Sequence, residues 1–178
     1  MYKEIDVYDY MNDILKGIKN ASLLTTKSGD EVNTMTISWG KIGIEWNKLI
    51  FITYVRKNRY TRKLIDKSGE FTINIPLNQS VKKITSYCGT KSGKDTDKIK
   101  DLGLTLVDGN KVSVPGIKEL ALTLECKLIY SQLQDKSAIS SDIQKDFYPE
   151  GVSGDFCGSN EDYHIAYYGQ VVGAHILD

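Results

Sequence analysis

Apolar and polar residues alternate along much of the chain, which is the pattern of strands that bury one face. Two alternating runs follow each other closely, VNTMTISWGKIGIEW over 32–46 and LIFITYV over 49–55, and we expect them to pair across Asn47–Lys48. The preceding run SLLTTK ends in a Ser-Gly-Asp turn, so the three runs predict an antiparallel meander. Further strands are expected over 70–76, in a hairpin around Asp108–Gly109, over 120–133 and over 163–177.

The helical signals are shorter and lie between the strands. Apolar residues three and four positions apart predict an amphipathic helix over 8–19. The expected boundary residues of the later helices are Asn58 and Gly69 for 58–69, Ser80 and Gly89 for 80–89, and Gly103 after a third helix near 97–101. Because no regular strand–helix–strand repeat is present, the pattern predicts a mainly β fold, a closed antiparallel barrel with short peripheral helices.

Length and charge narrow the function classes. The 178 residues predict a single domain over 1–178, and the 23 Lys plus Arg are balanced by 23 Asp plus Glu. Proteins that grip nucleic acid or an anionic membrane need a basic excess, so we expect neither partner. No apolar run approaches the roughly 20 residues that span a bilayer, and the N-terminus has no export pattern. We therefore expect a cytoplasmic protein.

The residues that usually carry metal or acid–base chemistry are few. There is no CxxC pair and there are only two histidines, so no metal centre is expected. His164, within an alternating run, is interpreted as structural, and Glu125 as an outward partner of Lys127, with an inward carboxylate as the alternative. The three cysteines are expected to be reduced and mostly buried, with a redox role left open: Cys88, Cys126 and Cys157.

A basic cluster marks the start of the helix expected over 58–69. Cations at a helix N-terminus oppose the macrodipole, whereas an anion bound there accepts the free backbone N–H groups and neutralises the side chains. A phosphate pocket is therefore one hypothesis, with Thr61 as a further donor. A solvated basic face balanced by Asp66 and Glu70, or nucleic-acid binding, are the alternatives. The cluster consists of Arg56, Lys57, Arg59, Arg62 and Lys63.

The run over 32–40 has a polar face whose role the strand pattern does not explain. Thr34, Thr36 and Ser38 share one side of the expected strand. If the strand lies beside the basic helix start, the two describe an elongated slot for a phosphorylated flat heterocycle. An aromatic wall could come from Trp39, Tyr54 or Tyr60, although a core or subunit-interface role is an equal alternative. GKIGIEW does not match GxGxxG, so no Rossmann dinucleotide domain is expected.

Six motifs in a fixed order carry a family resemblance. They are NTMTISWGKIG, VRKNRYTRKLI, EFTINIP, YCGTKSGKDTDKI, VPGIKELALTLECKL and YHIAYYGQVV. In this order they resemble the flavin reductase-like, FMN-binding split-barrel proteins, particularly the flavoredoxin-type branch. The resemblance implies a six-stranded split barrel and a homodimer with FMN near the subunit interface. The segment over 135–162 matches none of the family's motifs, so the cover of the flavin's open face is not assigned.

The resemblance also implies which residues contact the cofactor. The isoalloxazine and ribityl chain would be bordered by Met35, Thr36, Ile37, Ser38 and Trp39. The phosphate would be surrounded by Arg56, Arg59, Tyr60 and Thr61. The Ser92–Gly93 loop and Lys98 would close the site, from the same or the partner subunit.

The implied activity is redox chemistry that belongs to the cofactor. We expect hydride transfer from NADH or NADPH, as a transient co-substrate, to bound FMN and on to free flavin, a redox partner protein or another acceptor. Such a transfer needs stacking and distance, which fits the missing hydrolytic motifs. The alternatives are a flavoredoxin-type electron carrier without its own NAD(P)H oxidation and a barrel that binds ligands without redox chemistry.

Overall fold

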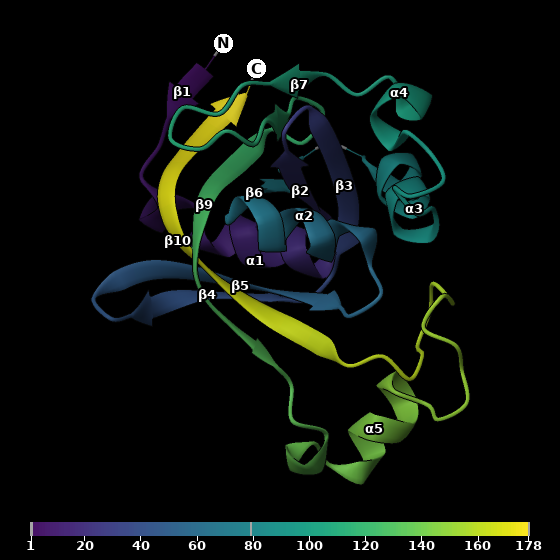
Figure 1. Cartoon of the computed structure of the whole chain (residues 1–178). Helices are drawn as coiled ribbons and strands as arrows, with labels where there is room; N and C mark the ends of the chain where they lie inside the picture. Colours follow the sequence, from purple (N-terminus) through teal and green to yellow (C-terminus); the bar gives the residue numbers. More distant parts are fainter. Residues whose placement is uncertain (1, 79, 178) are drawn as a thin grey trace.

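The computed structural model describes residues 2–78 and 80–177, and its centre is an antiparallel sheet that curls around a buried interior (Figure 1). The main sheet has the order β3-β2-β6-β9-β10-β5-β4, with β1 paired to β10. Its strands are β1 (Tyr2–Glu4), β2 (Ser22–Ser28), β3 (Glu31–Ile37), β4 (Gly40–Glu45), β5 (Lys48–Arg56), β6 (Glu70–Ile75), β9 (Leu122–Leu133) and β10 (His164–Leu177). The described part of the chain therefore has eight strands in this sheet, where the resemblance implied six.

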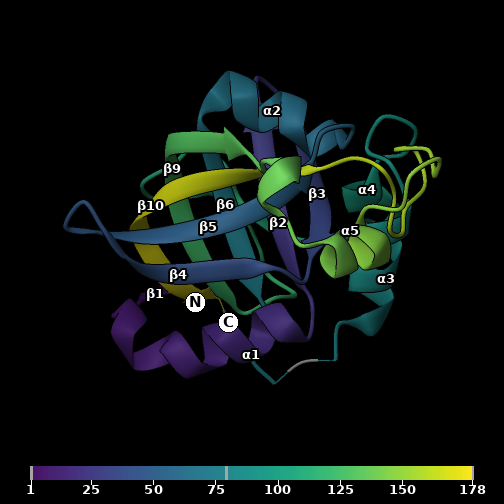
Figure 2. The same cartoon turned by 90° about the horizontal axis from the view of Figure 1, so that it is seen from below.

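A small second sheet and five α-helices complete the described fold. The second sheet pairs β7 (Leu106–Val107) with β8 (Gly116–Ile117). The helices are α1 (Met11–Lys19), α2 (Tyr60–Ser68), α3 (Lys82–Thr90), α4 (Lys98–Leu102) and α5 (Ser141–Phe147), with 3₁₀ turns at Val7–Tyr10 and Lys136–Ala138. They lie around the outside of the strands (Figures 1 and 2). Within the described ranges no helix is long and apolar enough to cross a membrane.

The helix boundaries confirm the glycine predictions at α2 and α4. Gly69 and Gly103 end these helices in the left-handed conformation. The expected N-caps are wrong: α2 begins after Arg59 and α3 after Val81, and neither helix has a side-chain cap. Helix α3 also continues one residue past Gly89, to Thr90.

The long strand expected over 32–46 is wrong, because the chain leaves the strand at Ser38–Trp39. The halves β3 and β4 lie at opposite ends of the sheet order, with β3 on β2 and β4 on β5. Gly40 lies so close to Phe51 that an added Cβ would be 2.8 Å from its ring, so a larger residue at this position would displace that ring. The β4–β5 turn is Trp46–Asn47, both with positive φ, one residue earlier than expected.

The core lies inside the curled sheet and closes onto α1. Its large fully buried side chains include Phe51, Phe71 and Tyr167. Gly169 sits at a register shift between β9 and β10, and a Cβ there would be 2.3 Å from the ring of Phe71. A side chain at position 169 would collide with Phe71 on β6 and with Cys126 on β9, so glycine suits this bulge.

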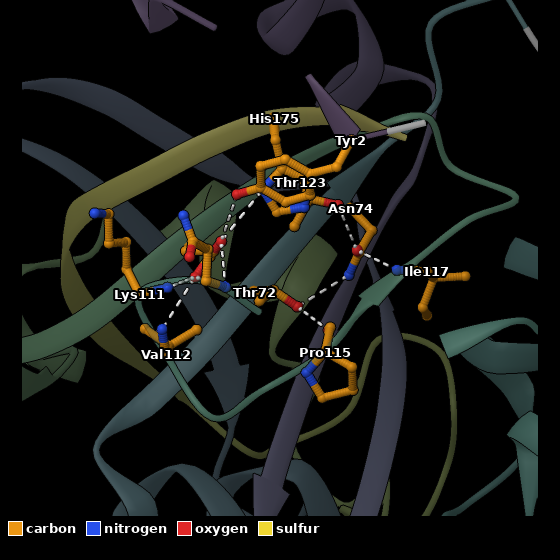
Figure 3. A network of polar contacts seen from close by, with 11 residues as sticks. Tyr2, Thr72, Asn74, Lys111, Val112, Pro115, Ile117, Thr123 and His175 are labelled. Carbon is orange, nitrogen blue, oxygen red and sulfur yellow. Dashed lines mark hydrogen bonds and ion pairs between the residues drawn. The ribbon is translucent and has the colours of Figure 1, made fainter. Parts of the chain in front are cut away.

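Glu125 organises a polar network away from the cavity described below, and its partners Lys111, Val112 and His175 are labelled in Figure 3. Its fully buried carboxylate accepts main-chain N–H bonds from Asn110, Lys111 and Val112 at 2.6–3.1 Å and lies 3.2 Å from His175 Nδ1. Burial raises the pKa of Glu125, but the His175 contact and these N–H groups outweigh it and lower the pKa to about 2.

Two predictions about this region are therefore wrong. Glu125 faces inward, not toward Lys127. The expected hairpin around Asp108–Gly109 is a loop that folds over the carboxylate, and β7 pairs instead with β8. The buried charge recruits three main-chain donors, and this long-range interaction overrides the local turn preference of Asp-Gly.

Candidate functional site

A cavity of about 920 Å³ opens where β3, the end of β5, the start of α2 and the α3–α4 loop meet. The segment between β9 and β10 forms its remaining wall. All candidate residues from the sequence line this one cavity: Met35, Thr36, Ile37, Ser38, Trp39, Arg56, Arg59, Tyr60, Thr61, Ser92, Gly93 and Lys98. A volume of this size is typical of sites for small organic ligands and cofactors.

One end of the cavity is cationic. Helix α2 begins there with Arg59 as its N-cap residue and no side-chain cap, and no acidic residue occupies its first turn. The Arg59 guanidinium donates to the main-chain oxygen of Cys157 at 3.1 Å. The helix N-terminus and the Arg59 charge therefore favour an anion at the same place.

Lys98 adds a buried ammonium to this end. Its side chain is 3% exposed, and Nζ donates to the main-chain oxygen of Cys88 at 3.3 Å. Burial, together with the nearby charge of Arg59, lowers the pKa of Lys98 to about 8, although Cys88 opposes the shift. Burial raises the pKa of the Cys88 thiol to about 11, so it remains neutral near pH 8. A buried lysine with a single carbonyl partner is stabilised by an anionic ligand.

Asn33 ties this end of the cavity together. Its Nδ2 donates to Thr61 Oγ1 at 2.8 Å, which joins β3 to the first turn of α2. Gly93 packs on the same amide so closely that an added Cβ would be 2.1 Å from Asn33 Oδ1. A side chain at position 93 would have to displace the Asn33 amide, which bonds Thr61, so glycine suits the close approach of the α3–α4 loop to β3. The Tyr60 side chain extends toward Glu31, and its hydroxyl donates a short hydrogen bond to the Glu31 carboxylate.

The hydroxyl face of β3 is largely occupied by the protein itself. Thr34 accepts from Thr25 at 3.1 Å and donates to the main-chain oxygen of Leu24. Thr36 donates to the main-chain oxygen of Thr85 in α3. Two of the three hydroxyls that the sequence offered to a ligand therefore bond within the protein, Thr34 to β2 and Thr36 to α3, and only Ser38 is exposed.

Aromatic side chains form the other end of the cavity. Trp39 is 38% exposed and packs edge-on against Phe147, with ring centroids 5.2 Å apart. Tyr54 and His164 also line this end, and the rings of Trp39 and His164 are 4.9 Å apart. Trp39 and Tyr54, two of the three aromatic residues suggested for an apolar wall, therefore line the cavity together with Phe147 and His164, which the sequence did not single out for the site.

His164 is held as a neutral acceptor. Burial and the charges of Arg56 and Arg59 lower its pKa to about 3. Its Nδ1 lies 2.9 Å from the hydroxyl of Tyr148, which in turn donates to Gln134 Oε1 at 2.8 Å. With the Tyr148 hydroxyl assigned as the donor to Gln134, the matching tautomer of His164 donates from Nδ1 and leaves Nε2 as a hydrogen-bond acceptor.

The covering segment, defined as residues 147–162, is held over the cavity by Arg56. The guanidinium donates to the main-chain oxygens of Phe147, Asn160 and Asp162. Asn160 is fully buried, and its Nδ2 donates to the main-chain oxygen of Phe156 at 2.7 Å. Arg56 therefore lines the cavity, but both of its terminal nitrogens donate to main-chain oxygens of the covering segment. In Figures 1 and 2 the segment lies on the same side of the sheet as α3.

The covering segment is the part of the site that sequence reasoning missed. The cavity residues that it supplies include Gly154, Asp155, Cys157 and Ser159. Cys157 is exposed, whereas Cys88 and Cys126 are buried as expected. Among the described residues no group of His, Cys, Asp or Glu could hold a metal ion.

A family model described as a flavin reductase like domain matches residues 18–178. The chain belongs to the flavin reductase-like family. A protein of Pyrococcus abyssi is 35% identical over 106 residues, which cover 60% of this chain and 59% of that protein. The chain therefore spans less than two thirds of the length of this relative.

Solved structures of flavin reductase-like proteins share the fold. Flavoredoxin from Methanosarcina acetivorans is 25% identical, with a TM-score of 0.62, over 86% of this chain and 66% of that one. An FMN-binding domain of a flavin reductase-like enzyme from Shewanella baltica is 19% identical, with a TM-score of 0.67, over 99% and 77%. These likenesses confirm the predicted fold class, a mainly β split barrel with short peripheral helices.

Proposed function

We propose that this flavin reductase-like protein is an FMN-binding oxidoreductase that passes hydride from NADH or NADPH to bound FMN and on to free flavin or another acceptor. The observation that carries the proposal is the cavity itself, with a cationic end at Arg59 and Lys98 and an aromatic end at Trp39. A phosphorylated flat heterocycle needs both ends in one hollow.

The described residues fit FMN by their donor chemistry. Lys98 is a buried cation with one carbonyl partner, and Arg59 and the start of α2 add positive charge beside it. Thr61 and Ser92 offer hydroxyls to the same phosphate end. Arg56 contributes its charge and holds the covering segment, since its terminal nitrogens are already engaged. Met35, Ile37 and Trp39 would border the ring system.

Bound FMN supplies the two-electron redox chemistry. The chain's own residues would bind the cofactor, orient it and exclude water from its ring system. Trp39 and Phe147 give the ring end an apolar wall, and the covering segment restricts access from solvent. His164 Nε2 offers a hydrogen-bond acceptor at this end, which can orient a donor on the flavin or on the co-substrate.

The test is a titration of the purified protein with FMN, followed by anaerobic mixing with NADH and NADPH in a stopped-flow spectrometer. Binding should quench FMN fluorescence. NADH or NADPH should then reduce the bound flavin, which is measured as the loss of its visible absorbance. Failure to bind FMN contradicts the whole proposal.

A flavoredoxin-type electron carrier is the second candidate, and the likeness to Methanosarcina acetivorans flavoredoxin favours it. A carrier of this type would receive electrons from a redox partner protein. Bound FMN that stays oxidised in excess NADH and NADPH, but is reduced by dithionite, would support the carrier over the enzyme.

We also propose a homodimer with the cofactor near the subunit interface. An exposed aromatic cluster at the β4–β5 turn, at the other end of these strands from the cavity, supports an association surface but not the place of the cofactor: Trp46 is 56% exposed, and its ring packs with Tyr130 and Tyr168 at 6.1 and 6.4 Å. Ile44 on the same hairpin is 60% exposed. Contiguous exposed apolar surface of this kind marks interaction sites in many proteins. Sedimentation equilibrium tests the assembly.

A further inference from the structure

A second hollow lies next to the cavity. It is a groove of about 710 Å³ with walls from α1 and β4, which run beside each other in Figure 2. Ser38, Trp39 and Tyr54 line both the groove and the cavity. These three side chains therefore border both hollows, and one extended ligand that passes them can occupy both.

The groove carries positive charge from both walls. Lys19 is the last residue of α1, and Lys41 lies on β4 with its Nζ 5.9 Å from the ring centroid of Tyr54. Of the described residues that line the groove, none carries a carboxylate, and neither lysine has an ion-pair partner among the described side chains. Leu15 and Ile18 add apolar surface. This composition suits a ligand with phosphates and a flat apolar ring.

We propose that the groove binds the phosphate-bearing adenosine half of a reduced nicotinamide dinucleotide, whose nicotinamide reaches the cavity past Trp39 and Tyr54. The inference rests on the proposed function, and it adds where and by which residues the co-substrate is held.

The separation of charges supports this occupant. Arg59 and Lys98 line the cavity but not the groove, while Lys19 and Lys41 line the groove but not the cavity. Two phosphorylated ligands can therefore bind together without competing for the same cations. A co-substrate that carries its own phosphates and reacts with a ring in the cavity matches this arrangement.

The test measures the NADPH concentration dependence of flavin reduction in FMN-loaded protein by anaerobic stopped-flow. Lys19→Gln and Lys41→Gln should each raise the apparent Kd for NADPH about threefold to tenfold, and Lys41→Glu should raise it further. The limiting reduction rate should not change, because the lysines hold a part of the ligand that does not react. Lys16→Gln in the last turn of α1 and Lys48→Gln at the start of β5 are matched controls outside the groove.

A second readout is independent of flavin chemistry. ADP-ribose, which lacks the nicotinamide ring, should shift backbone amide signals around Gly40 and Lys41 in a titration followed by nuclear magnetic resonance, and Lys41→Gln should weaken that binding.

Unchanged Kd values together with an absent or displaced ADP-ribose response would overturn the groove assignment, even if NADPH reduces the flavin normally. If FMN binds, neither dinucleotide reduces it, and ADP-ribose still shifts the groove signals, then the groove assignment stands and the proposed hydride transfer fails.

Discussion

If FMN binds as proposed, we expect Lys98 to make its affinity depend on pH, with a sign and size that follow from the burial of this side chain. Its pKa of about 8 means that the side chain is mostly an ammonium at pH 7 and mostly neutral at pH 9. Only the ammonium attracts a phosphate. If affinity scales with the protonated fraction, FMN should bind about tenfold more weakly at pH 9 than at pH 7, a difference of about 1.4 kcal/mol.

Fluorescence quenching titrations of FMN at pH 7, 8 and 9 measure this dependence. Lys98→Gln should bind FMN more weakly at pH 7 and show a flat profile, whereas Lys100→Gln, an exposed lysine on the same helix, should behave as the wild type. Riboflavin lacks the phosphate, so its affinity should not follow Lys98. The neighbouring Cys88 thiol, with a pKa of about 11, does not titrate in this range.

The unbound protein should show the opposite trend in stability. Because the folded pKa of Lys98 is depressed, the unfolded chain binds this proton more tightly, and stability rises between pH 8 and 10.5. Equal FMN affinity at pH 7 and pH 9, or a pH profile that survives in Lys98→Gln, would refute the placement of the phosphate beside this side chain.

Four further changes test separate parts of the structure. Arg59→Met should weaken FMN binding about tenfold to a hundredfold in the same titration by removing a charge-assisted contact, while Lys67→Met in the last turn of α2 should not. Glu125→Ala should lower the free energy of unfolding in urea by about 3–5 kcal/mol. The folded pKa of Glu125 is lowered to about 2, so the stability that this carboxylate contributes to the wild type should be lost progressively as the pH falls from 4.5 toward 2. Trp46→Lys should convert a dimer into a monomer at sedimentation equilibrium, and a monomeric wild type contradicts the proposed interface. Cys157→Ser should leave the stopped-flow rate of flavin reduction unchanged, and a large loss with an intact fold would instead indicate a thiol role.

The alternating pattern predicted the strands well where burial alone decides them. The runs that became β5, β6, β9 and β10 alternate in sequence because one face of each carries apolar core side chains, while polar side chains such as Thr72 and Asn74, although buried, lie on the other face, and a single sequence carries that signal. The break between β3 and β4 carries no such signal. At Ser38–Trp39 the chain passes from pairing with β2 to pairing with β5, a long-range arrangement that local alternation does not encode.

The same reasoning explains what was found and missed in the site. The cationic end was visible because Arg59 and Thr61 occupy a helix start, where local electrostatics has a fixed sign. The covering segment was not visible, because Arg56 holds it through main-chain oxygens, which every residue possesses. The inward Glu125 was missed for a related reason, since its partners are main-chain N–H groups of a loop.

The central claim is that the cavity binds FMN with its phosphate at the start of α2. A crystal structure of the protein with FMN tests it most directly. We predict the phosphate within hydrogen-bond distance of Arg59, Thr61 and Lys98, with the ring system against Trp39. Flavin bound elsewhere, or a phosphate directed into solvent with Lys98 still on the Cys88 carbonyl, would contradict the account.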